Sequence, residues 1–234
     1  MLLKNMSDYF TKKELLLWIG SILTILISFI LFKGDNTLSL IASLIGVTSL
    51  IFCAKGNPFG QFLIIIFSLL YGIISFSYAY YGEMITYLGM TAPIALFSMI
   101  TWLKNPYECN KSEVEVKHLK LKDIIPMIIL TVIVTFVFYF ILDYFNTANL
   151  IPSTFSVTTS FLAIYLTTKR SPFYAVAYAA NDLVLIVLWS IAAKTNITYV
   201  SVIVCFAVFL LNDIYGFINW QKMHKRQTTG EMCQ

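Results

Sequence analysis

Long apolar runs separated by short polar segments occupy nearly the whole chain. A helix that crosses a bilayer needs about 20 mostly apolar residues, because hydrocarbon offers no hydrogen-bond partners to backbone amides. Eight runs meet this requirement, so the pattern predicts eight transmembrane helices. Their approximate ranges are Leu15–Phe32, Leu38–Ala54, Gly60–Tyr81, Met84–Leu103, Ile124–Leu142, Asn149–Leu166, Phe173–Ala193 and Thr198–Trp220.

The connections between these runs are too short to hold a folded domain outside the membrane, and the longest lies between Lys104 and Asp123. We therefore expect a single membrane domain over residues 1–234. At its start, Thr11 followed by Glu14 predicts a capping box that opens the first helix. The expected parts are an N-terminal segment with an extra helix (1–37), a first triplet of helices (38–104), a connection with a linker helix (105–148), a second triplet (149–220) and a cytoplasmic tail (221–234).

Composition and charge support this interpretation. Of the 234 residues, 59% are hydrophobic and 12% are charged, whereas about a quarter are charged in a typical soluble domain. If eight helices span the membrane, 14 of the 16 lysines and arginines lie on one side, and Lys33 and Lys194 lie on the other. Because cytoplasmic loops collect lysine and arginine, both termini are expected in the cytoplasm.

Part of the sequence occurs twice. Lys55–Phe59 precedes the third predicted helix and the similar Lys169–Phe173 precedes the seventh, while Trp102 and Trp220 end the fourth and the eighth. The two tryptophans are also typical of interfacial anchors. Because one helix separates the two triplets, both have the same orientation across the membrane. Parallel repeats of this kind form a known transporter architecture, with the substrate between them. The expected fold class is therefore all-α, with two parallel three-helix repeats, a linker helix and an extra N-terminal helix.

Two Asn-Asp pairs interrupt the apolar runs of the second triplet. Asn181 and Asp182 lie near the middle of the seventh helix, and Asn212 and Asp213 lie in the inner half of the eighth. Such residues are expensive in hydrocarbon and normally face a protein interior or a water-filled cavity. The alternative is that they only join helices through hydrogen bonds.

Helical spacing places aromatic side chains on the same faces as these polar pairs. Aromatic planes and amides together suit a flat ring that carries hydroxyl groups, and a cationic ring gains further attraction from the π faces. In the first triplet, Tyr87, Thr91 and Pro93 are further candidates for the facing wall, and Pro93 predicts a bend. The candidate substrate-binding residues are Asn181, Asp182, Trp189, Asn212, Tyr215, Tyr178, Gln61, Tyr71, Asp213 and Trp220.

The sequence has no Walker A, H-E-x-x-H or G-x-S-x-G motif, and its four cysteines include no C-x-x-C pair. We therefore expect a protein that is not an enzyme and that needs no cofactor or metal. The expected partners are a small molecule and the lipid bilayer, without nucleic acid, and a homo-oligomer is left open.

Three segments carry a resemblance to a known family. Phe209–Trp220, with Ala180–Trp189 and Tyr81–Asn105, resembles the PnuC family, and the likeness extends over spans two to eight. It implies a carrier of the bacterial inner membrane for vitamin B precursors, chiefly nicotinamide riboside, with a three plus one plus three bundle related to the SWEET sugar carriers. It also implies facilitated diffusion, after which a cytoplasmic kinase traps the nucleoside. The substrate contacts that it implies are Asn181, Trp189, Asn212, Tyr215 and Trp220.

The substrate stays open at this point. Thr91–Ala95 differs from better-known members, which often have bulkier aromatic or polar residues there. Nicotinamide riboside and thiamine carry a positive ring, which buried carboxylates and aromatic faces favour, so the order of preference is nicotinamide riboside, thiamine and then riboflavin. A membrane sensor or assembly partner that transports nothing is the alternative from another class.

Overall fold

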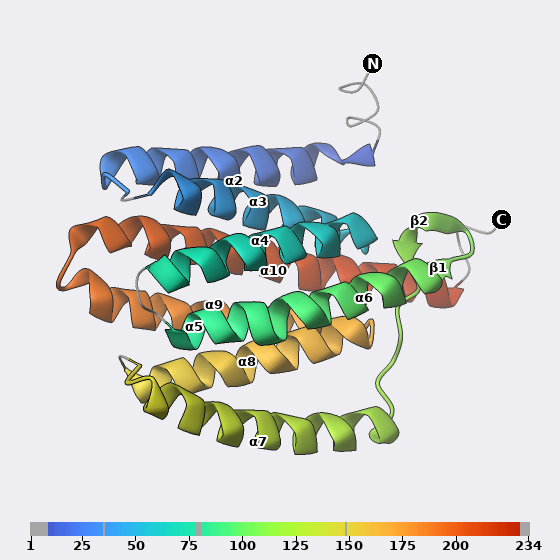
Figure 1. Cartoon of the computed structure of the whole chain (residues 1–234). Coiled ribbons are helices and arrows are strands. Elements are labelled where there is room, and N and C mark those ends of the chain that lie inside the picture. The colour runs from blue at the N-terminus through green and yellow to red at the C-terminus, as the bar shows by residue number, and fades with distance from the viewer. Residues whose placement is uncertain (1–8, 35, 78–80, 148, 230–234) are drawn as a thin grey trace.

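The computed structural model describes residues 9–34, 36–77, 81–147 and 149–229. Within them, eight helices are long and apolar enough to cross a membrane, which confirms the number expected from the hydropathy pattern. They lie side by side in one bundle (Figure 1). Seven of them are single α-helices: α2 (Lys12–Leu31), α3 (Thr37–Ala54), α4 (Pro58–Ser77), α7 (Leu121–Tyr144), α8 (Leu150–Thr168), α9 (Tyr174–Ala193) and α10 (Val200–Thr229). The fourth span along the chain is continuous but has three parts, α5 (Tyr81–Ile85), the π-helix η1 (Thr86–Thr91) and α6 (Ala92–Lys104). A short 3-10 helix, η2 (Ile197–Tyr199), precedes α10.

The extra helix α2 and the linker helix α7 lie at opposite edges of the bundle, and the two triplets lie between them (Figure 1). The first triplet is α3, α4 and the α5–α6 segment, and the second is α8, α9 and α10. The most hydrophobic helix, α7, is also the one that the rest of the protein covers least. Its apolar side chains therefore face lipid.

Two local features follow the sequence closely. The capping box of α2 is present: Thr11 N–H donates to Glu14 Oε2 over 2.7 Å, and Glu14 N–H donates to Thr11 Oγ1 over 3.3 Å. Pro93 is the second residue of α6, which follows directly on the π-helical stretch η1. Since proline has no N–H to donate and cannot be accommodated by a regular turn, a wider turn precedes it, as expected for a distortion at this position.

The repeat extends further than the two triplets. Lys55 pairs with Glu14 over 3.1 Å, and the equivalent Lys169 pairs with Asp123 over 2.9 Å. Glu14 lies in the first turn of α2 and Asp123 in the first turn of α7, and each carboxylate accepts a hydrogen bond from the backbone N–H of the N-cap residue. The hydrogen bond to Asp123 raises the pKa of the Lys169 ammonium, so this ion pair persists well into alkaline solution. The extra helix and the linker helix thus have matching places, and the bundle consists of two four-helix units.

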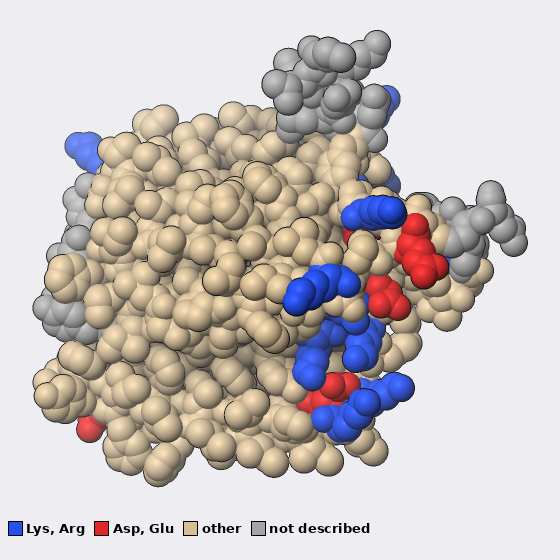
Figure 2. All heavy atoms as spheres, turned by 45° about the vertical axis from the view of Figure 1, so that its right-hand side comes forward, with Lys and Arg blue, Asp and Glu red and all other residues tan. Residues whose placement is uncertain are grey.

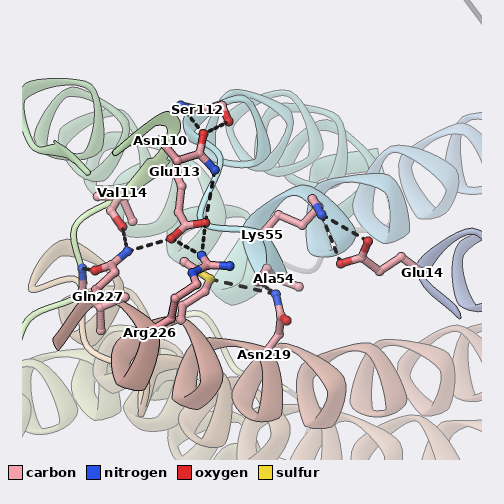
Figure 3. A network of polar contacts seen from close by, with 12 residues as sticks. Glu14, Ala54, Lys55, Asn110, Ser112, Glu113, Val114, Asn219, Arg226 and Gln227 are labelled. Carbon is pink, nitrogen blue, oxygen red and sulfur yellow. Dashed lines mark hydrogen bonds and ion pairs between the residues drawn. The ribbon is translucent and has the colours of Figure 1, made fainter. Parts of the chain in front are cut away.

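Two elements were not predicted. The connection after α6 forms a hairpin of β1 (Pro106–Tyr107) and β2 (Asn110–Val114), whose strands are too short and too polar to leave a hydropathy signal. The last helix also continues to Thr229, well into the expected tail. Figure 3 shows why both are ordered: Arg226 on α10 forms an ion pair with Glu113 on β2, and Gln227 donates to the Val114 carbonyl over 3.0 Å.

Charged side chains gather at one end of the bundle (Figure 2). This end carries the hairpin, the two repeated lysine turns and the end of α10, with ion pairs such as that of Arg170 with Glu115. The uneven charge expected from the sequence is therefore a property of one face of the folded protein, which we call the charged end.

Candidate functional site

The two Asn-Asp pairs are buried between the triplets. Asn181, Asp182, Asn212 and Asp213 are between 2% and 6% exposed. Three of these four side chains line one cavity near the middle of the bundle, which encloses about 610 Å³ of empty space including its open part. We call it the central cavity. It is lined by Gly46, Ser49, Leu50, Ile64, Phe67, Tyr87, Thr91, Ser160, Tyr178, Asn181, Asp182, Phe206, Phe209 and Asp213.

Hydroxyl groups of α8 fix the amide of Asn181. Its Oδ1 accepts hydrogen bonds from Ser156, Thr159 and Ser160 over 3.2, 2.9 and 3.1 Å. Because the carbonyl oxygen is used in this way, the amide NH₂ group is the part of Asn181 that remains to donate into the central cavity. Helices α8 and α9 thereby present a fixed donor to a ligand.

The two carboxyl groups form the acidic side of the cavity. Asp182 on α9 and Asp213 on α10 interact directly with each other. The Oδ2 atom of Asp182 is buried and has no hydrogen-bond partner among the described residues. No lysine or arginine is present among the described residues that line the central cavity. A positively charged ligand would therefore meet two carboxyl groups here without competition from a basic side chain.

Aromatic rings provide much of the remaining wall. Tyr87 comes from the first triplet and Tyr178 from the second, and three phenylalanines close the side away from the charged end. The three phenylalanines, Phe67, Phe206 and Phe209, also line a second cavity of about 740 Å³, which we call the outer cavity. They separate the two cavities, and we call them the phenylalanine partition. The Phe67 and Phe209 rings pack edge to face, with their centroids 6.1 Å apart.

The glycine at position 46 makes room for this partition. A Cβ atom there would lie 2.6 Å from Phe209 Cζ and 3.2 Å from Phe67 Cδ2. Real Cβ atoms do not come this close to a ring carbon, so any larger residue would displace the rings. The absence of a side chain at Gly46 on α3 therefore allows the phenylalanines to pack as they do.

The predicted site residues occupy several places. Asn181, Asp182, Tyr178 and Asp213 line the central cavity. Tyr71 and Trp189 line the outer cavity, toward the end of the bundle opposite the charged end. The remaining four are at neither cavity in the described structure; they are Gln61, Asn212, Tyr215 and Trp220.

Asn212 and Tyr215 face the extra helix α2. The Asn212 amide donates to Ser21 Oγ over 2.9 Å and to the Val208 carbonyl over 2.8 Å. The Tyr215 hydroxyl donates to Glu14 Oε1 over 2.8 Å. These two residues therefore hold α10 against α2 in this conformation.

Gln61 and Trp220 lie closer to the charged end than the central cavity does. Gln61 is 1% exposed and its amide donates to Cys53 Sγ over 3.3 Å. Trp220 and Trp102, which have the sequence context of interfacial anchors, are both completely buried. Their indoles lie inside the protein, where they contact each other.

Sequence reasoning missed the phenylalanine partition and Glu83. The phenylalanines have no polar signal, and the repeat aligns Phe67 with Asn181, so only the folded structure places them together. Glu83 is not among the candidate residues, because its place in a tight turn between two apolar runs favours a solvated side chain. In the structure it lies on α5, lines the outer cavity, and hydrogen-bonds with Tyr71 and Ser75.

Comparison with known proteins agrees with this architecture. The family model described as "Nicotinamide mononucleotide transporter" matches residues 36–222, from the start of α3 to just beyond Trp220. The nicotinamide riboside transporter PnuC of Neisseria mucosa is 25% identical over 237 residues, covering 96% of this chain and 90% of that protein. The nicotinamide riboside transporter PnuC of Haemophilus influenzae is 25% identical over 195 residues, which cover 82% of this chain and 82% of that protein.

A solved structure supports the same assignment at the level of the fold. The crystal structure of the vitamin B3 transporter PnuC superposes with a TM-score of 0.80 at 24% identity, covering 93% of this chain and 94% of that one. It is an all-helical membrane transporter, as is the bundle described above. The family model covers about four fifths of the chain, leaves out only α2 and the two ends, and describes transporters rather than enzymes. The chain therefore belongs to the PnuC family of membrane transporters, the nicotinamide mononucleotide transporter family.

Proposed function

We propose that this protein carries nicotinamide riboside across the bacterial inner membrane. The observation that supports this most strongly is the composition of the central cavity, where an oriented amide, two carboxyl groups and aromatic rings surround one space and the described lining residues include no lysine or arginine. A pyridinium ring gains from carboxylates and π faces, and the amide NH₂ group of Asn181 can donate to sugar hydroxyls. The names of the Neisseria and Haemophilus relatives give the same substrate.

The charge of the cavity favours the riboside over the mononucleotide of the family description. The mononucleotide carries a phosphate, which needs arginine, lysine or a helix N-terminus as its partner. In the central cavity, the phosphate would instead face the carboxyl groups of Asp182 and Asp213. A phosphate placed near them would be repelled, whereas the uncharged ribose of the riboside would not.

We assign different roles to the predicted site residues. Asn181, Asp182, Tyr178 and Asp213 would contact the substrate in the central cavity, and Tyr71 and Trp189 would contact it first in the outer cavity. Asn212 and Tyr215 would act by holding α10 in place, since their polar atoms are directed toward α2. Gln61 and Trp220 would contact substrate only after it has moved toward the charged end.

The proposed mechanism is facilitated diffusion with trapping by a cytoplasmic kinase. Family resemblance supports it, and the excess of lysine and arginine supports an orientation with the charged end and both termini in the cytoplasm. Thiol-directed labelling tests the orientation: Lys33→Cys is expected to react with an impermeant reagent in intact cells, and Lys104→Cys only after the cells are opened.

Uptake into proteoliposomes of purified protein tests the substrate. Labelled nicotinamide riboside should equilibrate without any ion gradient, and unlabelled nicotinamide riboside should compete with it more strongly than the mononucleotide, thiamine or riboflavin does. Stronger competition by thiamine would move the assignment to a thiamine carrier. Uptake that collapses with an uncoupler would replace facilitated diffusion with proton coupling. Absence of uptake of all four compounds would favour a sensor or assembly partner.

A further inference from the structure

Two tryptophans form a pair between the triplets. Trp102 on α6 and Trp220 on α10 are both 0% exposed, and their ring centroids are 5.3 Å apart. The two tryptophans occupy equivalent positions, each in the third member of its triplet and toward the charged end. A residue that only anchors a helix at the membrane surface would leave its indole N–H at the interface, and neither of these does so.

Each indole reaches into the opposite triplet. Trp102 Nε1 donates to the Thr167 carbonyl on α8 over 2.9 Å, and Trp220 Nε1 donates to the Cys53 carbonyl on α3 over 2.8 Å. Cys53 and Thr167 are equivalent, because each lies two residues before the lysine of the repeated turn. The two hydrogen bonds are therefore the same contact made twice, once in each direction. We call the two indoles with their two acceptor carbonyls the tryptophan clasp.

The clasp lies between the central cavity and the charged end. On α10, Trp220 is seven residues beyond Asp213, which lines the cavity; this is about 10 Å along a helix. The Tyr174 and Trp220 rings pack edge to face, with their centroids 4.9 Å apart. In the other direction, only the phenylalanine partition separates the central cavity from the outer cavity. The path is thus closed most firmly on the side of the charged end.

We propose that the tryptophan clasp is the gate at the charged end, and that it must release in every transport cycle. This rests on the proposed function only in requiring that a solute passes through the central cavity. Since each hydrogen bond joins one triplet to the other, parting the triplets at this end breaks both together. Two equivalent contacts that make and break together give a closed state and an open state with few intermediates.

Labelling of a native thiol tests the gate without any substrate. Cys53 is 1% exposed and lies within the clasp, whereas Cys205 lines the outer cavity. In lipid nanodiscs, where both faces are accessible, a charged thiol reagent should modify Cys53 slowly in the unchanged protein. Trp220→Phe and Trp102→Phe keep a ring but lose the donor, and should each speed the modification of Cys53 about tenfold. Peptide mapping separates Cys53 from the other cysteines.

Trp18→Phe is the matched control. Trp18 Nε1 donates to Thr48 Oγ1 over 3.2 Å, so the same donor is lost, but between α2 and α3 rather than between the triplets. Its Cys53 should react as slowly as in the unchanged protein. Equal rates in all four proteins, or an equal acceleration by Trp18→Phe, would overturn the proposal.

A disulfide across the same end provides a second test with both tryptophans intact. Ser98 Oγ on α6 and Thr168 Oγ1 on α8 are 2.6 Å apart, and they join the first triplet to the second one turn from the clasp. Oxidised Ser98→Cys/Thr168→Cys should lose transport, and a reductant should restore it. Thr135→Cys/Thr158→Cys joins α7 to α8 within one unit, where the hydroxyl oxygens are 2.8 Å apart, and should transport in both states. Full transport by the oxidised Ser98→Cys/Thr168→Cys protein would exclude a gate here.

Discussion

At the scale of single residues, the proposed function predicts that the charge of Asp182 contributes to the affinity for the substrate. Asp182→Asn keeps the shape of the side chain and removes its charge. Since two unit charges 4 Å apart attract by about 4 kcal/mol near a protein surface, we expect the dissociation constant of nicotinamide riboside to rise at least about tenfold, equivalent to about 1.4 kcal/mol. Titration calorimetry on the purified protein measures this.

Two controls separate charge from shape in this experiment. The reduced riboside has a neutral ring, so its affinity should change little in Asp182→Asn. Asp143→Asn makes the same substitution at an exposed position on α7 and should leave both affinities unchanged. If the neutral and the charged ring lose affinity equally, the carboxyl group of Asp182 acts through geometry rather than charge.

The phenylalanine partition depends on the absence of one side chain. Gly46→Ala adds a Cβ atom 2.6 Å from Phe209 Cζ, which forces the ring to move. Such overpacking costs about 1–3 kcal/mol, so thermal unfolding should occur at a lower temperature and uptake should slow because a displaced ring obstructs the path. Gly20→Ala, where the new Cβ atom would have no atom within 4 Å beyond the backbone of its own helix turn, should leave both measurements nearly unchanged.

At the scale of elements, one buried carboxylate joins α2 both to the end of α3 and to α10. Glu14 is 2% exposed and accepts hydrogen bonds from Lys55 and from Tyr215. Replacing one member of a buried ion pair leaves the other without a partner, so Glu14→Gln should lower the free energy of unfolding by up to about 3 kcal/mol. Thermal melts in detergent provide the measurement.

The matched control is Glu115→Gln, whose carboxylate pairs with Arg170 but is 59% exposed. An exposed pair contributes about 0–1 kcal/mol, so the melt should hardly change. Equal destabilisation by the two substitutions would mean that α2 is attached mainly by its apolar contacts.

An element can be predicted from the sequence when the residues that determine it are neighbours in the chain. The eight spans were predictable because each needs a long apolar run, and the capping box at Thr11 and Glu14 because both partners lie within one turn. The strand Asn110–Val114 was not, because what orders it is contact with Arg226 and Gln227, more than 100 residues away. The polar pair Asn181 and Asp182 stood out from the apolar sequence around it, whereas Phe67 did not.

Across the whole molecule, the two four-helix units are alike at the charged end and differ at the central cavity. The equivalent ion pairs of Lys55 and Lys169 and the two indole hydrogen bonds make the units alike at the charged end. The cavity breaks this likeness, since the repeat aligns Asp182 with Ser68, and both carboxyl groups come from the second unit. The repeat was visible in the sequence, but the direction in which Asn212 and Tyr215 point was not, because it depends on α2.

If the substrate is the cationic riboside, as proposed, transport itself should respond to the membrane potential. A carrier that moves a cationic riboside alone transfers one positive charge per cycle, and one charge crossing 100 mV changes its free energy by about 2.3 kcal/mol. Proteoliposomes held at 100 mV negative inside should therefore accumulate nicotinamide riboside about 50-fold over the medium, and reversing the potential should expel it. Riboflavin is neutral, so any entry of riboflavin should be unaffected. Accumulation that ignores the potential and follows the pH gradient would instead mean that the Asp182 and Asp213 pair exchanges a proton for the substrate.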